Sequence, residues 1–342
     1  MEKREQRGIA LDNKLSKLIK LVQKLPEKCL DEAIKFVEEQ IEEESENTPD
    51  ISCPQCKSAN AQRYGRRGER QRYKCKNCEK IYTKTTNTSI SQSHCGEALW
   101  KQVIRDTIED VPLRKTSSNL EISEDTAFRM RHKILLALEV EESLSPTVIE
   151  GVCELDDTYV LESLKGSKIP EAYWRESRKH GAVAQKRGIS NEYICISTGV
   201  QREGQAIAKT VTRATPQADD HISVFGESID SESLILCDGA LSYNVLGEHC
   251  ECDVMNVTEN SKGGKGFFNI NTVNNFHGFI KGKLLKYRGV ATKYLNRYNT
   301  FFSNAFKGGD DLADTIFSIL MKNDGNRCHS VADVKTLNLL DI

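Results

Sequence analysis

Residues 148–161 read VIEGVCELDDTYVL, an apolar, β-rich run that is interrupted by two neighbouring carboxylates, Asp156 and Asp157. Successive side chains of a strand point to opposite faces, so Glu154 and Asp156 share one face and Asp157 lies on the other. An ionised carboxylate is costly in a central strand unless it is paired or binds a metal. The stretch therefore predicts a core strand that carries a functional acid.

Further β-rich runs and two late helical pieces follow this strand. The runs are YICISTGV at 193–200, AIAKTVT at 206–212 and SLILCDGAL at 233–241, and the helical pieces are VNNFHGFIKGKLLKYRG at 273–289 and DDLADTIFSILMK at 310–322. Strands first and helices late are typical of an α/β or α+β domain. We expect this domain to span residues 148–325, with a C-terminal tail at 326–342.

A second acid, Asp238, follows the apolar run LILC and precedes Gly239. It therefore lies at the carboxyl end of a strand, where the active sites of α/β proteins collect. Alone, either Asp156 or Asp238 is more typical of a turn-capping residue. Together they are the hard oxygen ligands that a Mg²⁺-dependent phosphoryl-transfer site requires.

A third ligand is expected from a helix in the basic region 262–307. There Asn274, His277 or Gly278, and Lys281 share one helical face. Asn274 offers a neutral carbonyl oxygen, a weaker metal ligand than glutamate, and Lys281 is placed to hold a phosphate or to offset developing charge. In the competing interpretation, Asn274 caps the helix and Lys281 is an ordinary surface charge.

Four of the twelve cysteines form two CxxC pairs, CPQC and CKNC, with eighteen residues between them. Two such pairs complete a tetrahedral zinc site, and four coincidental cysteines are improbable at this spacing. The intervening chain predicts a hairpin, so we expect a zinc ribbon at 50–90 whose stability comes from the metal. A closed site of four cysteines is structural rather than catalytic. Its predicted ligands are Cys53, Cys56, Cys75 and Cys78.

Charge is distributed unevenly along the chain. The net charge of −2 argues at first against a nucleic-acid partner. However, residues 57–84 carry ten basic and two acidic side chains, residues 262–307 carry nine basic side chains and no acid, and residues 27–46 carry nine acids against two lysines. A charge run is often only a solvated face, but these basic blocks coincide with the zinc and metal motifs, which favours phosphate binding.

Residues 95–142 read as three helices. Ser123 is a good N-cap for the third helix, which we expect to expose Arg129, Arg131, His132 and Lys133. This pattern is typical of a helix-turn-helix, although a plain three-helix connector is nearly as compatible with it. The predicted DNA contacts in the zinc ribbon and the helical region are Arg66, Arg67, Arg70, Arg72, Arg129, Arg131 and Lys133.

Membrane and secreted classes are not expected. No apolar stretch approaches the roughly 20 residues of a membrane span, and the start lacks the apolar region of a secretory signal. Residues 1–46 are expected to be helical, with apolar stripes on both sides of Pro26. Such a helical pair packs on a partner, for instance in a dimer, or forms a loosely attached cap.

The chain resembles bacterial insertion-sequence transposases of the branch with a zinc ribbon and an Asp-Asp-Asn-Lys variant of the acidic triad, related to Merlin elements. The resemblance spans roughly residues 50–305. The segments that carry it are CPQC…YKCKNC, W…SEDTAFRMRHKIL, ELDDTYV, LCDGALSYN and NTVNNFHGFIKGKLLKYRGVATKYLNRY.

The resemblance implies a ribonuclease-H-like (DDE-type) catalytic core within the α/β fold. Asp156, Asp238 and Asn274 then correspond to the three metal ligands and Lys281 to the family lysine, with Mg²⁺ or Mn²⁺ as the catalytic metal. The implied partners are double-stranded DNA, at terminal inverted repeats and target, and further copies of the chain in a homodimer or higher oligomer. The implied location is the bacterial cytoplasm, on the nucleoid. The roles of Glu154 and His277 stay open.

Two other functions compete with an active transposase. A DNA-binding regulator with an inactive core would bind DNA and have no use for the pair Asp156 and Asp238. A related nuclease would cut DNA without joining it, and sequence alone separates it poorly from a transposase.

Overall fold

The computed structural model describes residues 51–68, 70–169, 171, 173–178, 183–257 and 264–323. The chain divides into two compact units, Met1–Thr86 and Asn87–Ile342. The helical segment predicted at 1–46 and the tail predicted at 326–342 lie outside the described residues. Among the residues that the structure describes, no helix combines the length and the apolar character that a membrane span requires.

The first unit is built around a small antiparallel sheet. β1 (Ala61–Arg67) pairs with β2 (Arg70–Cys75), and β2 pairs with β3 (Ile81–Tyr82), so the hairpin predicted between the two CxxC pairs is confirmed. Among the described residues of this unit, 51–68 and 70–86, the buried apolar cluster consists of Cys53, Cys75 and Tyr82. A cluster this small cannot offset the conformational entropy lost when these residues fold, so they need another source of stability.

The second unit contains a five-stranded sheet in the order β6-β5-β4-β7-β8. The strands are β4 (Val152–Leu161), β5 (Tyr193–Gln201), β6 (Ala206–Arg213), β7 (Leu234–Cys237) and β8 (Asp253–Asn256). β5 runs antiparallel to both of its neighbours, β4 and β6, whereas β7 runs parallel to both of its neighbours, β4 and β8. The predicted strand with the two aspartates is therefore the central strand, β4.

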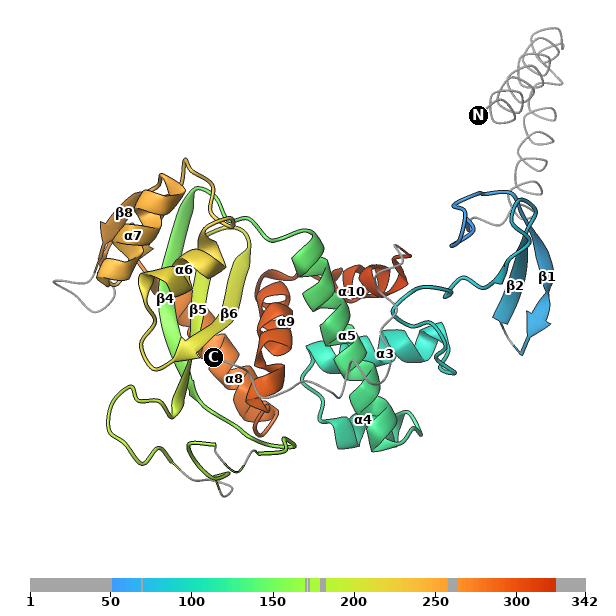
Figure 1. Cartoon of the computed structure of the whole chain (residues 1–342), viewed down its shortest axis with the longest axis horizontal. Helices are drawn as coiled ribbons and strands as arrows, with labels where there is room; N and C mark the ends of the chain where they lie inside the picture. Colours follow the sequence, from blue (N-terminus) through green and yellow to red (C-terminus); the bar gives the residue numbers. More distant parts are fainter. Residues whose placement is uncertain are drawn as a thin grey trace, which may run out of the picture. The chain divides into compact units, whose positions relative to one another are not determined.

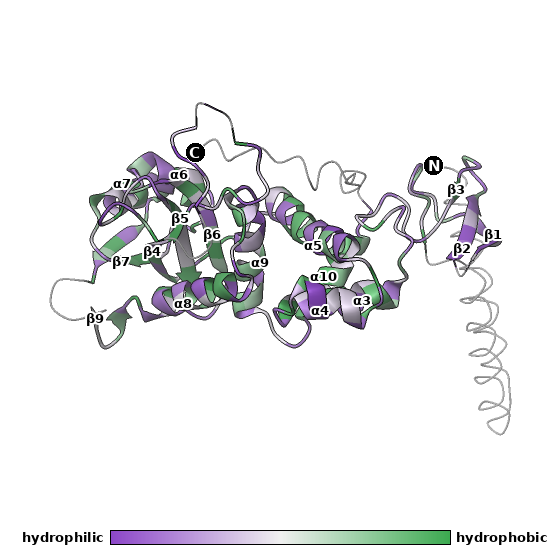
Figure 2. Ribbon diagram, turned by 90° about the horizontal axis from the view of Figure 1, so that it is seen from below, coloured by the Kyte–Doolittle hydropathy of each residue, from purple (hydrophilic) through white to green (hydrophobic). Residues whose placement is uncertain are grey.

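Helices cover both faces of this sheet (Figure 2). α6 (Ala218–Phe225) and α7 (Leu241–Cys250) pack on one face, in a cluster with Cys153 and Leu155 of β4. On the other face lie α8 (Asn271–Lys286) and α9 (Leu295–Lys307), together with the short helix η2 (Thr292–Tyr294). A two-stranded hairpin, β9 (Gly264–Lys265) and β10 (Phe268–Asn269), precedes α8.

The helices before the sheet share its hydrophobic core. They are α3 (Glu97–Ile108), α4 (Leu113–Asn119) and α5 (Glu124–Leu144), and α10 (Leu312–Met321) packs against them (Figure 1). The predicted N-cap is confirmed, because the backbone N–H of Thr126 donates to the Ser123 hydroxyl at 3.1 Å. Trp100 of α3, Ile134 of α5 and Phe276 of α8 belong to one cluster, so these helices are fixed to the helix that lies on β4.

Three cysteines of the sheet are buried and pack as small apolar side chains. Cys153 and Cys195 are fully buried, and Cys237 is 1% exposed. Burial raises the pKa of the Cys153 thiol to about 12, and it also raises the pKa values of Cys195 and Cys237. These thiols are therefore neutral packing groups rather than nucleophiles.

Candidate functional site

Two aspartates come together on the neighbouring parallel strands β4 and β7, with Asp156 in the middle of β4 and Asp238 directly after the last residue of β7. The register pairs Glu154 with Leu236, and Asp156 and Asp238 lie two residues further along the chain from each. Burial raises the pKa of Asp156 to about 7, and the negative charge of Asp238 adds to the increase. The two carboxylates are therefore close enough to repel each other, as ligands that share a cation do.

Asp156 and Asp157 face opposite sides of β4, which confirms the predicted alternation. The Asp156 side chain is 19% exposed and accepts the backbone N–H of Asp157 at 2.8 Å. The Asp157 side chain instead accepts the Ser197 hydroxyl at 2.6 Å and lies 3.1 Å from Nε2 of the buried His221 of α6. Only Asp156 of this pair is therefore directed to α8.

Helix α8 places three polar side chains along one face. Asn274 and Lys281 are exposed, whereas His277 lies between them and is 8% exposed. Nδ1 of His277 is 3.8 Å from Oδ2 of Asp156. The charge of Lys281 lowers the pKa values of both Asp156 and His277. The structure thus brings His277 and Lys281 to Asp156, with Asn274 one helical turn earlier on α8.

The protonation state of His277 follows from its hydrogen bonds. Burial, together with the charge of the nearby Lys281, lowers the pKa of His277 to about 4, so the ring is neutral at pH 7. The Thr198 hydroxyl donates its one proton to the carbonyl of Asp156 at 2.7 Å. The 2.7 Å contact between Thr198 Oγ1 and His277 Nε2 must then use the proton on Nε2. The unprotonated Nδ1 consequently faces Asp156.

Glu154 anchors α8 to the central strand. Its side chain is fully buried, and it accepts the N–H groups of Thr272 and Val273 at 2.7 and 3.0 Å and the Thr272 hydroxyl at 3.0 Å. Nε of Arg202 lies 2.7 Å away and balances the charge. A carboxylate at a helix N-terminus satisfies otherwise unpaired amides and interacts favourably with the helix dipole. Glu154 therefore fixes the helix that carries Asn274, His277 and Lys281 opposite Asp156.

Replacing Glu154 by glutamine is expected to lower the free energy of unfolding of the second unit by about 3 kcal/mol. The change leaves the partly buried Arg202 without its counter-charge, and breaking a buried ion pair costs about 3–5 kcal/mol, of which the lower end applies because the Arg202 side chain is 18% exposed. Urea unfolding of the full chain measures the effect, with Glu248→Gln on the exposed face of α7 as the control. A loss no larger than that of Glu248→Gln would contradict the anchoring role.

The other end of α8 is held by Asp110, which lies between α3 and α4. Nζ of Lys283 and Nζ of Lys286 approach its carboxylate at 2.7 and 3.0 Å, and the Tyr287 hydroxyl donates to it at 3.1 Å. The guanidinium of Arg131 lies over the Tyr287 ring, 5.5 Å from its centre. Helix α8 is therefore fixed at its start to β4 and at its end to the α3–α5 helices.

The residues at this site suit a hard divalent cation. The candidate donors are the carboxylates of Asp156 and Asp238 and the amide oxygen of Asn274, and such oxygen atoms are the ligands that Mg²⁺ and Mn²⁺ prefer. The repulsion between the two carboxylates, together with the burial of Asp156, favours a bound positive charge.

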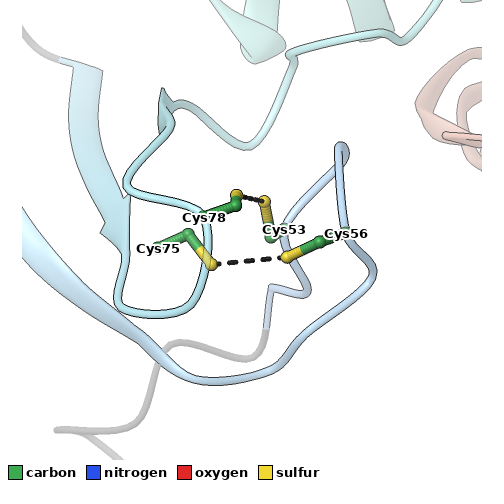
Figure 3. A group of neighbouring side chains, drawn as sticks. All are labelled: Cys53, Cys56, Cys75 and Cys78. Carbon is green, nitrogen blue, oxygen red and sulfur yellow. Dashed lines mark hydrogen bonds between the residues drawn. The ribbon is translucent and has the colours of Figure 1, made fainter.

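The four predicted zinc ligands form one cluster in the first unit (Figure 3). The sulfur atoms of Cys53, Cys56, Cys75 and Cys78 all lie within 4.8 Å of one another, and the pairs Cys53–Cys78 and Cys56–Cys75 are 3.5 Å apart. Zn–S bonds of about 2.3 Å in a tetrahedron place sulfur atoms about 3.8 Å apart, so the cluster fits a zinc ion. Burial raises the pKa of Cys75, but the backbone N–H groups of Cys78 and Asn77 outweigh it and bring that pKa to about 7.

The basic hairpin of the first unit exposes part of its charge. Arg66 and Arg67 of β1 are exposed, whereas Arg70 and Arg72 of β2 are half-buried. The guanidinium of Arg72 lies 5.6 Å from the ring centre of Tyr64, which is itself 43% exposed. The hairpin therefore presents cations and an aromatic side chain on its surface, a combination that suits a phosphate backbone.

The prediction that α5 exposes Arg131 and His132 is wrong. Arg131 is 2% exposed and donates to the carbonyl of Val111 at 2.6 Å, and His132 is 1% exposed. Both lie in the hydrophobic interior because α5 is packed by α3, α4, α9 and α10. Arg129 is partly exposed and pairs with Asp125 at 2.8 Å, and Nζ of Lys133 donates to the carbonyl of Ser89 at 3.3 Å.

Comparison with known proteins adds a family resemblance to this geometry. Residues 148–303 match the family described as an ISXO2-like transposase domain. A protein described as "Uncharacterized protein in transposable element ISH50", from Halobacterium salinarum, is 25% identical over 260 residues, which cover 72% of this chain and 82% of that protein. Both matches support an insertion-sequence transposase.

Among solved structures, the chain is similar to the one titled "Crystal structure of a pre-cleavage Mos1 transpososome". The sequence identity is 9%, the TM-score is 0.26, and the alignment covers 67% of this chain and 79% of that chain.

Proposed function

We propose that the chain is a DDE-type DNA transposase that binds the terminal inverted repeats of an insertion sequence and catalyses divalent-metal-dependent strand cleavage and strand transfer. The observation that carries the proposal is the half-buried Asp156 beside Asp238, opposite the fixed helix α8. Residues 148–303, which match a transposase domain, contain this entire arrangement.

The topology supports a ribonuclease-H-like core. Three antiparallel strands followed by two parallel strands, with β4 in the centre, place Asp156 and Asp238 on adjacent strands. The related zinc-ribbon branch with the Asp-Asp-Asn-Lys pattern is supported by Asn274 and Lys281, which occupy one face of α8 at the required spacing.

The site residues have separate proposed roles. Asp156, Asp238 and Asn274 hold Mg²⁺ or Mn²⁺, which when bound supplies Lewis-acid activation of the attacking hydroxyl group and neutralises phosphate charge. Lys281 binds a phosphate next to the cleaved bond and offsets the charge that develops on it. His277 is a positioning residue, because its proton on Nε2 is held by Thr198 and its ring packs against Asp156.

DNA recognition is proposed for the zinc ribbon at 50–90 and for a helix-turn-helix at 95–142. The zinc ion held by the four cysteines is structural, and a homodimer or higher oligomer assembles on DNA. We place the protein on the nucleoid of the bacterial cytoplasm. The proposed DNA contacts, from which the buried Arg131 is excluded, are Arg66, Arg67, Arg70, Arg72, Arg129 and Lys133.

The test uses a labelled duplex made from the DNA that flanks the reading frame. The purified full chain with Mg²⁺ is expected to cleave one strand at the element end and to join the new 3′-hydroxyl to a second duplex. Binding without cleavage would instead show a regulator, and cleavage without joining would show a nuclease.

Replacing both Arg66 and Arg67 by alanine is expected to weaken binding to this duplex and to leave the fold intact, because both side chains are exposed. The logarithm of the association constant for the duplex falls linearly with the logarithm of the salt concentration. Each phosphate contact that is lost makes this slope less steep by about one, so the double variant should reduce its magnitude by about two. Fluorescence anisotropy at several salt concentrations measures it. Lys57→Ala with Lys84→Ala removes the same charge elsewhere in this unit, and an equal loss in that control would show a general charge effect instead.

A further inference from the structure

A cavity of about 760 Å³ opens between the end of β4 and the C-terminal half of α8. Its walls are mostly apolar, and two cationic side chains, Lys281 and Arg288, complete the lining, which contains no acidic residue. The apolar wall residues are Val160, Leu161, Leu284, Leu285, Val290 and Leu295. Such a cavity is shaped for an organic group with a negative charge at one end.

The cavity adjoins the proposed catalytic site through Lys281. This lysine lines the cavity, and it lies one helical turn after His277, whose Nδ1 is 3.8 Å from Oδ2 of Asp156. Along β4, Val160 lies four residues beyond Asp156, which corresponds to about 13 Å at ~3.3 Å per residue. A phosphate bound by Lys281 therefore has the carboxylates on one side and the cavity on the other.

The walls are held in place by hydrogen bonds between distant segments. The N–H of Ser163 donates to the Thr292 hydroxyl at 2.8 Å, and the N–H of Thr292 donates to the carbonyl of Ser163 at 2.9 Å. Nζ of Lys293 donates to the carbonyl of Gly166 at 2.7 Å. The cavity is thus preformed, and its occupant does not have to build it.

Arg288 occupies a backbone conformation that disfavours its side chain. Its φ is 52°, in the left-handed region that glycine adopts without penalty, and Gly289 follows it. An arginine at this position costs stability that a glycine would not. The arginine is exposed and lines the cavity, and Leu285, one turn earlier, is 80% exposed. An anionic ligand with an apolar part could therefore contact both side chains.

We propose that the cavity receives a nucleotide that leaves the base stack of the bound DNA, with its base and sugar against the apolar walls and its phosphate between Lys281 and Arg288. This proposal rests on the proposed function. A stacked base cannot enter a lateral cavity, and unstacking is least costly near a strand end or a mismatch. At ~3.4 Å per nucleotide, 13 Å places the unstacked nucleotide within about four positions of the cleaved bond.

The test uses the duplex made from the flanking DNA, with 2-aminopurine placed singly at each of the four positions on either side of the mapped cleavage site. Wild-type protein, held uncleaving in Ca²⁺, is expected to raise 2-aminopurine fluorescence at one of these positions. Val290→Phe, which fills the cavity, and Arg288→Gly should each remove that rise. Val148→Phe, at a 51% exposed position before β4, should keep it.

Arg288→Gly also distinguishes a lost DNA contact from a loss of folding, because it is expected to raise the melting temperature while it weakens DNA binding. The glycine relieves the left-handed backbone, so the melting temperature should rise by about 2–4 °C, while DNA affinity falls and the salt slope decreases by about one. Arg288→Lys should restore the affinity. The control Glu251→Gly makes the same backbone change at the end of α7, where φ is 56°, and should raise the melting temperature without weakening DNA binding.

Two results would overturn the proposal. The first is that wild-type protein cleaves the duplex but raises 2-aminopurine fluorescence at none of the positions. The cavity would then hold a segment of the chain or of a second copy instead of a nucleotide. The other is DNA binding by Arg288→Gly and Val290→Phe that equals the wild type. A wild-type protein that binds but never cleaves would instead contradict the proposed function, so the two failures are distinguishable.

Discussion

Replacing Asp156 by asparagine is expected to reduce strand cleavage by about 1,000-fold or more, which corresponds to a loss of about 4 kcal/mol of transition-state stabilisation. The amide keeps the shape of the side chain and can still accept the N–H of Asp157, but it removes the negative charge that holds the cation. The measurement is single-turnover cleavage of the labelled duplex in Mg²⁺, with Asp253→Asn on β8 as the control.

The same substitution is expected to stabilise the protein without metal at pH 8. The pKa of Asp156 is about 7 in the folded protein, above the ordinary value of 3.8. The folded state therefore retains a proton that the unfolded state loses, and stability falls as pH rises from about 4 to about 7. Asparagine does not titrate, so the Asp156→Asn protein does not lose this stability. The difference in free energy of unfolding between Asp156→Asn and wild type is therefore absent near pH 4 and reaches its full size above pH 7.

Thermal melting in EDTA across this pH range measures the effect. Asp156→Asn should melt above wild type at pH 8 and close to it at pH 4, whereas Asp253→Asn should follow the wild type throughout. If Asp156→Asn cleaves DNA at the wild-type rate, the catalytic assignment is wrong. If it cleaves slowly but is no more stable at pH 8, the burial and repulsion described for Asp156 are wrong.

Removal of zinc is expected to unfold the first unit while the second unit stays folded. In the part of the first unit that the structure describes, the buried apolar cluster comprises Cys53, Cys75 and Tyr82, whereas structural zinc contributes about 10–16 kcal/mol of apparent binding free energy in small domains. Chelation, or Cys75→Ser, should therefore make the chain before residue 87 sensitive to protease. The melting transition of residues 87–323 should not shift, and DNA affinity should fall by about 100-fold or more, as the cations of the hairpin lose their arrangement.

Metal analysis and limited proteolysis check this prediction. Wild type should contain about one zinc per chain, and Cys75→Ser should contain almost none. Cys56→His, which supplies another zinc ligand, should retain the metal, and Cys252→Ser should behave as wild type because it lies outside the cluster. Protease resistance that survives complete removal of zinc would contradict the prediction.

The features that sequence predicts well depend on local chemistry. The strand with Asp156 and Asp157 follows from alternating side chains, and the start of α5 follows from the capping hydroxyl of Ser123. The four cysteines cluster as expected because each CxxC turn holds two thiols close together and the hairpin between the turns brings the two pairs side by side. In each case the residues that decide the structure lie within a short stretch, or repeat a short motif.

The features that sequence misses depend on contacts between distant segments. The charged residues around Arg131 predict an exposed helical face, but α5 is covered on several sides, so no single apolar stripe identifies its buried positions. Glu154 looks like one more strand acid, yet its partners include Thr272, 118 residues away. An acid two positions before Asp156, on the same face of an apolar strand, was the available signal, but it does not identify the helix that the acid anchors.

Because α8 follows Asp156 by more than a hundred residues, the proposed catalytic site cannot form until late in the synthesis of the chain. Asp156 leaves the ribosome 130 residues before Lys286, the last residue of α8, and at about 5–20 residues per second this interval is about 6–26 s. For most of that interval the chain already contains the zinc-ribbon cysteines, the basic hairpin and α3–α5, whereas Thr272, the partner of Glu154, and His277, the neighbour of Asp156, have not yet been synthesised. Under the proposed function, a growing or prematurely ended chain would occupy DNA without cutting it, and would compete with complete copies for the same ends.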